Sequence, residues 1–315
     1  MRILVMGGTR FVGVYLAKAL VAAGHEVTVL NRGNHPVPVA GVQQLTADRK
    51  DADQLKSALA GQSFDAVFDN NGRELSDTQS LVECLQSSNL QHFVYMSSAG
   101  VYLKSDQLPH VEGDALDPKS RHKGKADTEA YLQAQLEQTG FPYTSVRPVY
   151  IYGTGNYNDI EAFFFDRLHR DRPVLVPDNG AWITQLGHVS DLADAMVAVL
   201  GNSNAIGQIY NVSGDRFITF SGLVKRCAAV LNKEVELVYF NPKDFDLGKR
   251  KAYPLRVQHF FADISKARQE LNWSPKWSVD AGLKDFWEND YVASGRTEKT
   301  VDFEIDDRIL AVVQK

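Results

Sequence analysis

The stretch RILVMGGTRFVG, at residues 2–13, joins a short apolar strand to a glycine-rich turn and then to the start of a helix. Such a turn lets backbone amides approach a pyrophosphate, and the dipole of the following helix favours the negative charge. The alternative is a tight turn that only packs the helix onto the sheet, but the position after a first strand favours the binding role. The stretch therefore predicts a dinucleotide-binding turn made of Gly7, Gly8, Thr9, Arg10, Phe11, Val12 and Gly13.

Strand-like and helix-like segments alternate from this stretch onward, which is typical of a doubly wound parallel sheet. The strand segments are nearly continuous apolar runs, as expected for strands that helices cover on both faces. We expect strands at residues 2–6, 26–31, 42–46, 64–69, 92–97 and 143–147, and helices at 11–23 and 125–139. The pattern predicts an α/β protein of the Rossmann type.

The alternation changes after Pro148, where short strands, turns with proline or glycine, and separated helices follow. We therefore expect a dinucleotide-binding domain at residues 1–150 and a smaller substrate-side lobe at 151–294 that interleaves with late Rossmann elements. The polar residues 295–315 are expected to form a loosely held tail. Helical periodicity in the second part falls at residues 191–200, 221–231, 263–271 and 279–287.

The composition is that of an ordinary soluble globular protein, with 44% hydrophobic and 23% charged residues. No apolar run is long enough to span a membrane. The formal net charge of −5 means that nucleic-acid binding would need a local basic patch. The chain begins directly with strand residues and has two widely separated cysteines, so we expect a cytoplasmic protein without a signal or transit peptide. A homo-oligomer is compatible with this composition.

Polar residues at the ends of the strands indicate which dinucleotide is bound. The second strand ends in Asn31 and Arg32, where an NAD-binding protein usually has an acidic residue for the ribose 2′-hydroxyl. The missing acid, together with Arg10 in the glycine turn, favours a 2′-phosphate and so NADP over NAD. The alternative for Arg32 is a solvated loop charge. Further candidates follow the third and fourth strands, where Asp48 suits the adenine edge and Asn70 and Asn71 suit the other half of the dinucleotide.

Further motifs accompany the glycine turn: Ser97–Tyr102, Arg147-Pro148 with Tyr152-Gly153, His188-Val189 with Asp191, and Asp263–Ala267 with Leu271 and Trp273. With them, the sequence resembles the extended short-chain dehydrogenase/reductase superfamily, which includes NAD-dependent epimerases and dehydratases. The resemblance covers about residues 1–290 and implies the same Rossmann-type fold.

In that superfamily, a serine, a tyrosine and a lysine four residues after the tyrosine transfer protons. By this resemblance, Ser98 takes the serine position and Lys125 the lysine position. The tyrosine position then falls on Arg121, and a guanidinium stays protonated and cannot act as the base. The Tyr-x-x-x-Lys pattern from Tyr239 to Lys243 contains a proline, and we attribute it to chance. The resemblance therefore argues against ordinary epimerase or dehydratase chemistry.

Within the superfamily, the sequence is most similar to the chloroplast stem-loop-binding proteins and their cyanobacterial relatives. The stretches GGTRF at residues 7–11, FDNNG at 68–72 and RHKGK at 121–125 carry this similarity. It implies binding of structured RNA, including ribosomal RNA, and a metal-assisted endonuclease activity. The absence of a transit peptide implies the bacterial form.

Two basic stretches could serve RNA binding, because cations neutralise phosphates and an interleaved aromatic ring can stack on a base. The alternatives are solvated loop charges, or a site for an anionic sugar-nucleotide diphosphate at the first stretch. The first stretch contains Lys119, Arg121, His122, Lys123 and Lys125, and the second contains Lys249, Arg250, Lys251 and Arg256, with Tyr253 among them.

A nuclease would need a divalent metal held by carboxylates and carbonyls. Glu112, Asp114 and Asp117 cluster before the first basic stretch, although such loop acids usually serve solubility. The first hypothesis is thus an NADP-binding protein adapted to RNA binding, with RNA cleavage as a further activity. The rivals are a sugar-nucleotide epimerase, dehydratase or reductase, and a non-catalytic scaffold that senses NADP.

Overall fold

The computed structural model describes residues 1–85, 90–248 and 250–314. These residues form two compact units. The first unit comprises Met1–Val149, Val189–Ser213 and Ala262–Pro275, and the remaining described residues form the second. Each unit is therefore built from separate stretches of the sequence.

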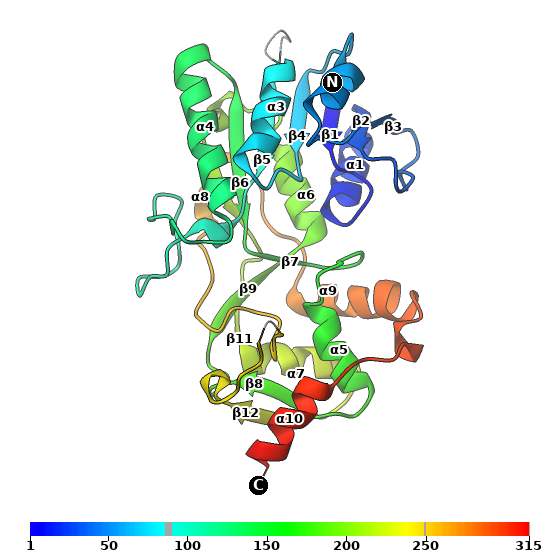
Figure 1. Cartoon of the computed structure of the whole chain (residues 1–315), viewed down its shortest axis with the longest axis vertical. Helices are drawn as coiled ribbons and strands as arrows, with labels where there is room; N and C mark the ends of the chain where they lie inside the picture. The colour runs from blue at the N-terminus through cyan, green and yellow to red at the C-terminus, as the bar shows by residue number, and fades with distance from the viewer. Residues whose placement is uncertain (86–89, 249, 315) are drawn as a thin grey trace. The chain divides into compact units, whose positions relative to one another are not determined.

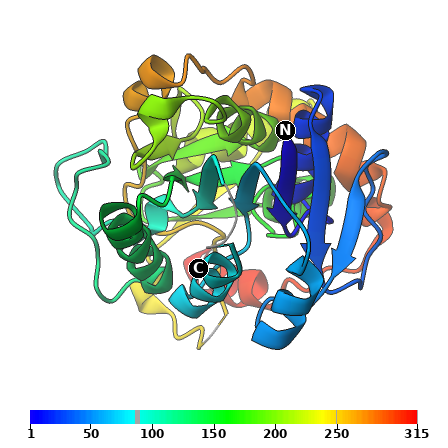
Figure 2. The same ribbon diagram turned by 90° about the horizontal axis from the view of Figure 1, so that it is seen from above.

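The first unit is built around seven parallel strands in the order β10-β6-β5-β4-β1-β2-β3 (Figure 2). The order runs outward from β1 and β4 in both directions, so ligands are expected beyond the carboxyl ends of these two strands. The predicted α/β fold with a doubly wound sheet is confirmed, and β10 adds a strand that the sequence analysis did not name. The strands are β1 (Arg2–Met6), β2 (Glu26–Asn31), β3 (Gln43–Thr46), β4 (Ala66–Asp69), β5 (His92–Met96), β6 (Tyr143–Pro148) and β10 (Ile209–Val212).

Helices cover both faces of this sheet (Figures 1 and 2). On one face, α1 (Val12–Ala22) packs against α6 (Val189–Ala198), and on the other face α3 (Leu75–Leu85) lies between α2 (Ala52–Leu59) and α4 (Lys123–Thr139). The short helix α8 (Ser265–Glu270) contacts β10. Apolar side chains of the strands, such as those of Val5 and Val67, are fully buried between the sheet and these helices. Helices α2 and α3 were not predicted, because both are rich in polar residues.

The second unit contains two small sheets around an aromatic core. One sheet has the order β11-β9-β7, and the other pairs β12 with β8. The core includes the fully buried rings of Phe164, Phe165, Phe220 and Tyr291. Among the described residues, no helix combines the length and apolar character needed to cross a bilayer. The elements are β7 (Tyr150–Tyr152), β8 (Val174–Pro177), β9 (Ile183–His188), β11 (Phe217–Thr219), β12 (Leu237–Phe240), α5 (Glu161–His169), α7 (Phe220–Val230), α9 (Val279–Phe286), a π-helix (Trp287–Val292) and α10 (Glu304–Val313).

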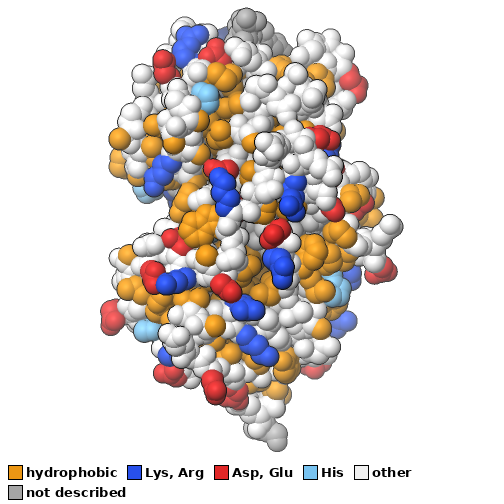
Figure 3. Space-filling view, turned by 180° about the vertical axis from the view of Figure 1, so that it is seen from behind, with side chains coloured by type: hydrophobic (Ala, Val, Ile, Leu, Met, Phe, Trp, Pro, Cys, Tyr) orange, Lys and Arg blue, Asp and Glu red, His pale blue; other side chains and the backbone are white. Residues whose placement is uncertain are grey.

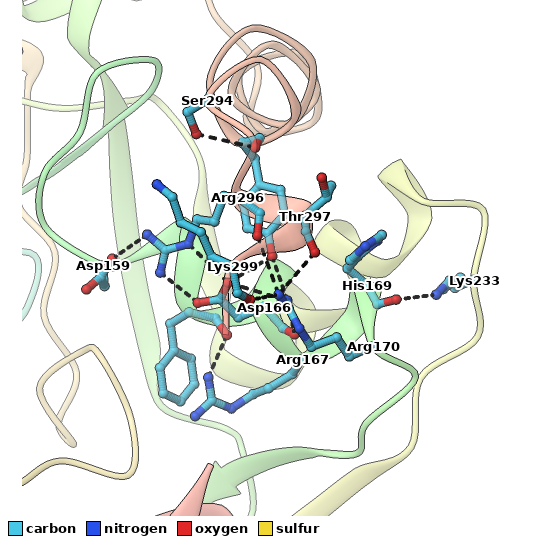
Figure 4. A network of polar contacts seen from close by, with 12 residues as sticks. Asp159, Asp166, Arg167, His169, Arg170, Lys233, Ser294, Arg296, Thr297 and Lys299 are labelled. Atoms are coloured by element: carbon cyan, nitrogen blue, oxygen red, sulfur yellow. Dashed lines mark hydrogen bonds and ion pairs between the residues drawn. The ribbon is translucent and has the colours of Figure 1, made fainter. Parts of the chain in front are cut away.

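The expectation of a loosely held tail after residue 294 is wrong for the described part of that segment. Helix α10 buries Ile305 and Ile309, and the carboxylate of Asp306 accepts two hydrogen bonds of 2.7 Å from Arg167 on α5. Figure 4 shows that Arg296 also reaches α5, where it binds Asp166 with hydrogen bonds of 3.0 and 2.7 Å. The polar residues that suggested a solvated tail are thus the partners of charges on α5.

Asp306→Ala is expected to lower the free energy of unfolding by about 3–5 kcal/mol, because it leaves the guanidinium of Arg167 buried without its carboxylate. Asp307→Ala is the matched control, since Asp307 pairs with Arg172 at the surface and its loss should cost about 0–1 kcal/mol. Urea unfolding of the two variants measures the difference. Equal losses would show that the Arg167–Asp306 pair contributes no more than a surface pair.

Candidate functional site

The glycine turn after β1 has no room for side chains at its key positions. An added Cβ at Gly8 would lie 2.4 Å from Val29 Cγ1, and one at Gly13 would lie 2.8 Å from the Gly8 Cα. Gly7 has a φ of +83°, and its amide donates to Leu30 O at 2.9 Å. Only glycine meets these conditions, so the turn lies tightly between β1, β2 and α1. This geometry fits a backbone cradle for a pyrophosphate.

The residues between these glycines bring the chain into α1. Phe11 has a φ of +40°, is buried and is the N-cap residue of the helix, and its side chain makes no capping hydrogen bond. Val12 is also buried, Thr9 is half-buried and Arg10 is exposed. The positive end of the α1 dipole suits an anionic group of a ligand.

The end of β2 offers a polar group that the protein itself does not use. The Oδ1 of Asn31 accepts hydrogen bonds from Gly33 N at 2.7 Å and from Gln44 Nε2 at 3.0 Å. Its Nδ2 is buried and has no hydrogen-bond partner among the described residues. The neighbouring Arg32 is exposed. A donor left open beside an exposed guanidinium fits the adenosine ribose or its phosphate.

The candidates after β3 and β4 differ in their surroundings. The carboxylate of Asp48 accepts from Lys50 N at 3.0 Å, which ties it to a local turn. Asn70 is buried, its Nδ2 lies 3.1 Å from the position of an added Cβ at Gly13, and its Oδ1 has no partner in the described part of the chain. Asn71 is exposed and packs against Gly7. The two asparagines therefore reach the glycine turn.

Sequence reasoning missed a buried ion pair beneath these asparagines. Arg49, which is 9% exposed, donates to both oxygens of the fully buried Asp69 at 2.6 and 3.0 Å. It also donates to Asn71 Oδ1 and, at 2.7 Å, to Asp77 O. The cation lowers the pKa of the Asp69 carboxyl against the effect of burial. Asp69 at the end of an apolar strand was the available signal, since a buried carboxylate requires a partner.

Lys125 and Ser98 lie at the carboxyl end of β5 and its neighbouring elements. Lys125 Nζ donates to Gly72 O at 3.0 Å and to Met96 O at 2.5 Å. Burial lowers the pKa of Lys125 to about 8, outweighing the carboxylates of Asp69 and Glu129. Ser98 Oγ accepts from Gly100 N at 3.0 Å, which caps a short 3-10 turn.

Arg121, which takes the tyrosine position by resemblance, lies outside the helix that carries Lys125. Helix α4 starts at Lys123, with His122 as its N-cap, and Arg121 is in the preceding turn. Residues four apart share a face only when both are helical. The Arg121 side chain is exposed, as expected, and its Nε donates to His122 Nε2 at 3.1 Å. Arg121 and Lys125 therefore do not form a one-turn pair on α4.

The acidic residues considered for a metal each accept a hydrogen bond within the first unit. Glu112 Oε1 accepts from Asn211 N at 2.8 Å, and burial raises the pKa of Glu112. Asp114 Oδ2 lies 2.9 Å from His110 Nδ1, within hydrogen-bond distance, and Asp117 accepts a hydrogen bond from Lys119 N at 2.8 Å. In residues 1–85, 90–248 and 250–314, no group of three or more His, Cys, Asp or Glu side chains is arranged to hold a metal ion.

The first basic stretch divides into an exposed part and a buried part. Lys119, Arg121 and Lys123 are exposed, and Lys123 pairs with Asp127 at 2.5 Å. The expectation that Lys125 belongs to the same surface is wrong, because its ammonium group turns inward to two backbone carbonyls. The surface that this stretch offers to a polyanion is thus smaller than predicted.

One cation of the second basic stretch, Arg250, is neutralised within its own unit. Arg250 donates to Asp302 at 2.7 Å and to Glu304 at 2.8 Å, while Lys249 lies outside the described residues. Tyr253 is buried in the aromatic core, so the expectation that it stacks on a base is wrong. On the face drawn in Figure 3, basic and acidic side chains lie next to one another.

Comparisons with known proteins agree with the resemblance inferred from the motifs. Residues 3–213 match the family described as "NAD dependent epimerase/dehydratase family". The "Chloroplast stem-loop binding protein of 41 kDa b, chloroplastic" of Arabidopsis thaliana is 47% identical over 98% of this chain and 84% of its own length.

Solved structures of sugar-nucleotide enzymes share the fold at low identity. UDP-glucose 4-epimerase of Thermotoga maritima with UDP-glucose has a TM-score of 0.80 at 23% identity, covering 94% of this chain and 100% of that chain. UDP-glucuronic acid 4-epimerase of Bacillus cereus with UDP-glucuronic acid and NAD has a TM-score of 0.75 at 21% identity, covering 93% and 99%. At these identities the likeness supports the fold alone.

The lowered pKa of Lys125 predicts a pH dependence of stability. Between about 8 and the ordinary value of 10.5, the unfolded chain binds more protons at this group than the folded chain. The free-energy contribution of Lys125 to stability therefore rises with pH over that window. We expect the unfolding free energy of the wild type minus that of Lys125→Met to rise from pH 8 to pH 10, as measured by urea unfolding. A difference that is constant over this range would contradict the lowered pKa.

Proposed function

Because the chain belongs to the NAD-dependent epimerase/dehydratase family, we propose that it binds NADP at the glycine turn and binds structured RNA through exposed cations near the start of α4. The family binds NAD(P), and the cradle of Gly7, Gly8 and Gly13 fits the pyrophosphate of such a ligand. The preference for NADP and the RNA surface are the new parts of this proposal.

The observation that carries the RNA part is the relative with 47% identity over 98% of this chain, which is named for stem-loop binding. The surface we assign to it consists of the helix-start cations Arg73, Lys119, Arg121 and Lys123, all of which are exposed. Arg73 lies next to the start of α4, because its carbonyl oxygen is 2.5 Å from the position of an added Cβ at Gly124 on that helix. Exposed cations of this kind bind phosphates with a strong dependence on salt.

The same region disfavours the proton transfer that an epimerase performs. Arg121 takes the position of the base by resemblance, has no hydrogen-bond acceptor in its guanidinium and lies before the first residue of α4. Glu129, one turn after Lys125, is held by Arg147 through hydrogen bonds of 2.9 and 2.6 Å. Ser98 serves as a cap for Gly100. These contacts count against the proton transfer that the sugar-nucleotide alternative requires.

The choice of NADP rests on the end of β2. An acid at this position would repel a 2′-phosphate, whereas Asn31 offers a buried, unpartnered Nδ2 and Arg32 an exposed guanidinium. Arg10 in the glycine turn adds a second exposed cation in the same unit. The charge at these positions suits a phosphate better than a hydroxyl.

RNA cleavage is tested in the same assay as RNA binding. Cleavage of the bound RNA that requires Mg²⁺ and stops with EDTA would add a nuclease activity to the proposal. Turnover of a sugar nucleotide would instead support the epimerase, dehydratase or reductase alternative, and NADP binding without RNA binding would support the scaffold alternative. We propose a cytoplasmic location for this chain, although the 47% identical relative is named as chloroplastic.

Replacing Lys119, Arg121 and Lys123 together by glutamine is expected to weaken stem-loop RNA binding. The plot of log K against log salt has a negative slope, and each cation that neutralises a phosphate contributes about −0.9 to it. The triple variant should therefore have a slope that is shallower by roughly 2 to 3. Fluorescence titrations at several salt concentrations, with and without NADP, measure this slope.

The matched control replaces Lys225, Arg226 and Lys284, exposed cations of the second unit, by glutamine. This control removes the same charge and should leave the slope unchanged. Equal losses in both triple variants would count against the helix-start cations as the binding surface. A wild type that binds no RNA at low salt would move the assignment to the sugar-nucleotide site.

Arg32→Glu is expected to weaken NADP binding by about tenfold or more and to change NAD binding little, because a charge-assisted hydrogen bond contributes about 1.5–3 kcal/mol. Isothermal titration of both dinucleotides measures the ratio of the two affinities. Lys18→Glu, an exposed position on α1, provides the same charge reversal as a control. Wild-type protein that binds NAD as tightly as NADP would refute the preference.

A further inference from the structure

The guanidinium of Arg49 connects three separate parts of the first unit. It donates to Asp69 at the end of β4, to the side chain of Asn71 in the following turn, and to Asp77 O in α3. A guanidinium presents its donors in a rigid planar fork, so these acceptors fix its orientation. Arg49 itself lies in the loop after β3, between the candidate Asp48 and helix α2.

Asn71 is the one of these partners that faces the glycine turn. Its Nδ2 lies 3.0 Å, and its Cγ 3.2 Å, from the position that a Cβ of Gly7 would occupy. Because the Oδ1 of the same amide accepts from Arg49, the amide plane is held with its NH₂ group toward Gly7. An exposed asparagine at a turn would otherwise sample several rotamers.

We propose that Arg49 is a positioning residue for the dinucleotide site, which fixes the amide of Asn71 against the glycine turn. This inference rests on the proposed binding of NADP at that turn. Arg49 does not touch the cofactor in this role, and it acts by holding the group that does. A preset amide binds its ligand more tightly because the side chain loses less rotamer freedom on binding.

Asp69 gives a way to separate this role from a purely structural one. Its carboxylate also accepts from Thr78 Oγ1 at 2.7 Å and from Gly72 N at 3.0 Å. Thr78→Val removes a hydrogen bond from the same buried carboxylate and leaves the contact between Arg49 and Asn71 in place. A loss of NADP affinity caused by general loosening would thus occur in Thr78→Val as well.

The test is NADP titration and thermal unfolding of wild type, Arg49→Lys, Asn71→Ala, the double variant and Thr78→Val. A lysine keeps the charge beside Asp69 but has no planar fork to reach Asn71 and Asp77 O together. We expect about tenfold weaker NADP binding in Arg49→Lys, in Asn71→Ala and in the double variant, because the two side chains act as one unit. Thr78→Val should have a lower melting temperature and the affinity of the wild type.

Several outcomes would overturn the inference. The first is an unchanged NADP affinity in Asn71→Ala, and the second is a folded Arg49→Lys that binds NADP like the wild type. The third is an affinity loss in Thr78→Val as large as that in Arg49→Lys. The fourth is a loss in the double variant that equals the sum of the two single losses. Asn71 is exposed, so its variant decides the question even if Arg49→Lys does not fold. A wild type that binds neither NADP nor NAD would refute the proposed function instead.

Discussion

The close approach of the glycine turn to its own strands is the constraint on which the first unit depends. Gly8 packs against Val29 of β2, and Gly13 packs against the backbone of Gly8, so β1, α1 and β2 meet without intervening side chains. This contact sets the angle at which α1 leaves the sheet and places the turn at the carboxyl end of β1. Asn70 and Asn71 then reach the same turn from the end of β4, so the candidate site is a product of the sheet order.

Buried ion pairs hold segments of the first unit together that backbone pairing does not join. Arg49 with Asp69 holds the turn after β4, and Glu129 with Arg147 ties α4 to β6. Removing such charges from water is costly, and the cost is offset only when each lone pair and N–H group has a partner. Both carboxylates here receive two hydrogen bonds from their arginine. The pairs therefore contribute to the unique arrangement of the turn after β4 and of α4 more clearly than to overall stability.

The sequence predicted the glycine turn and every strand of the main sheet except β10, because these elements follow short local patterns of apolar residues and glycine. It could not pair Arg49 with Asp69, since the partners are 20 residues apart and nothing local links them. It also placed Tyr253 in a basic surface, whereas the ring is buried among Phe164 and Phe220. Charge and aromatic content describe a segment, but its orientation depends on distant residues that cover it.

The contact between Arg167 and Asp306 can form only late in protein synthesis. These partners are separated by 139 residues, so α5 leaves the ribosome long before the carboxylate that neutralises its buried guanidinium. At a synthesis rate of about 5–20 residues per second, this interval lasts roughly 7 to 28 seconds. During that time the guanidinium of Arg167 lacks the carboxylate that pairs with it in the folded chain, so the contact between α5 and α10 forms only near the end of synthesis.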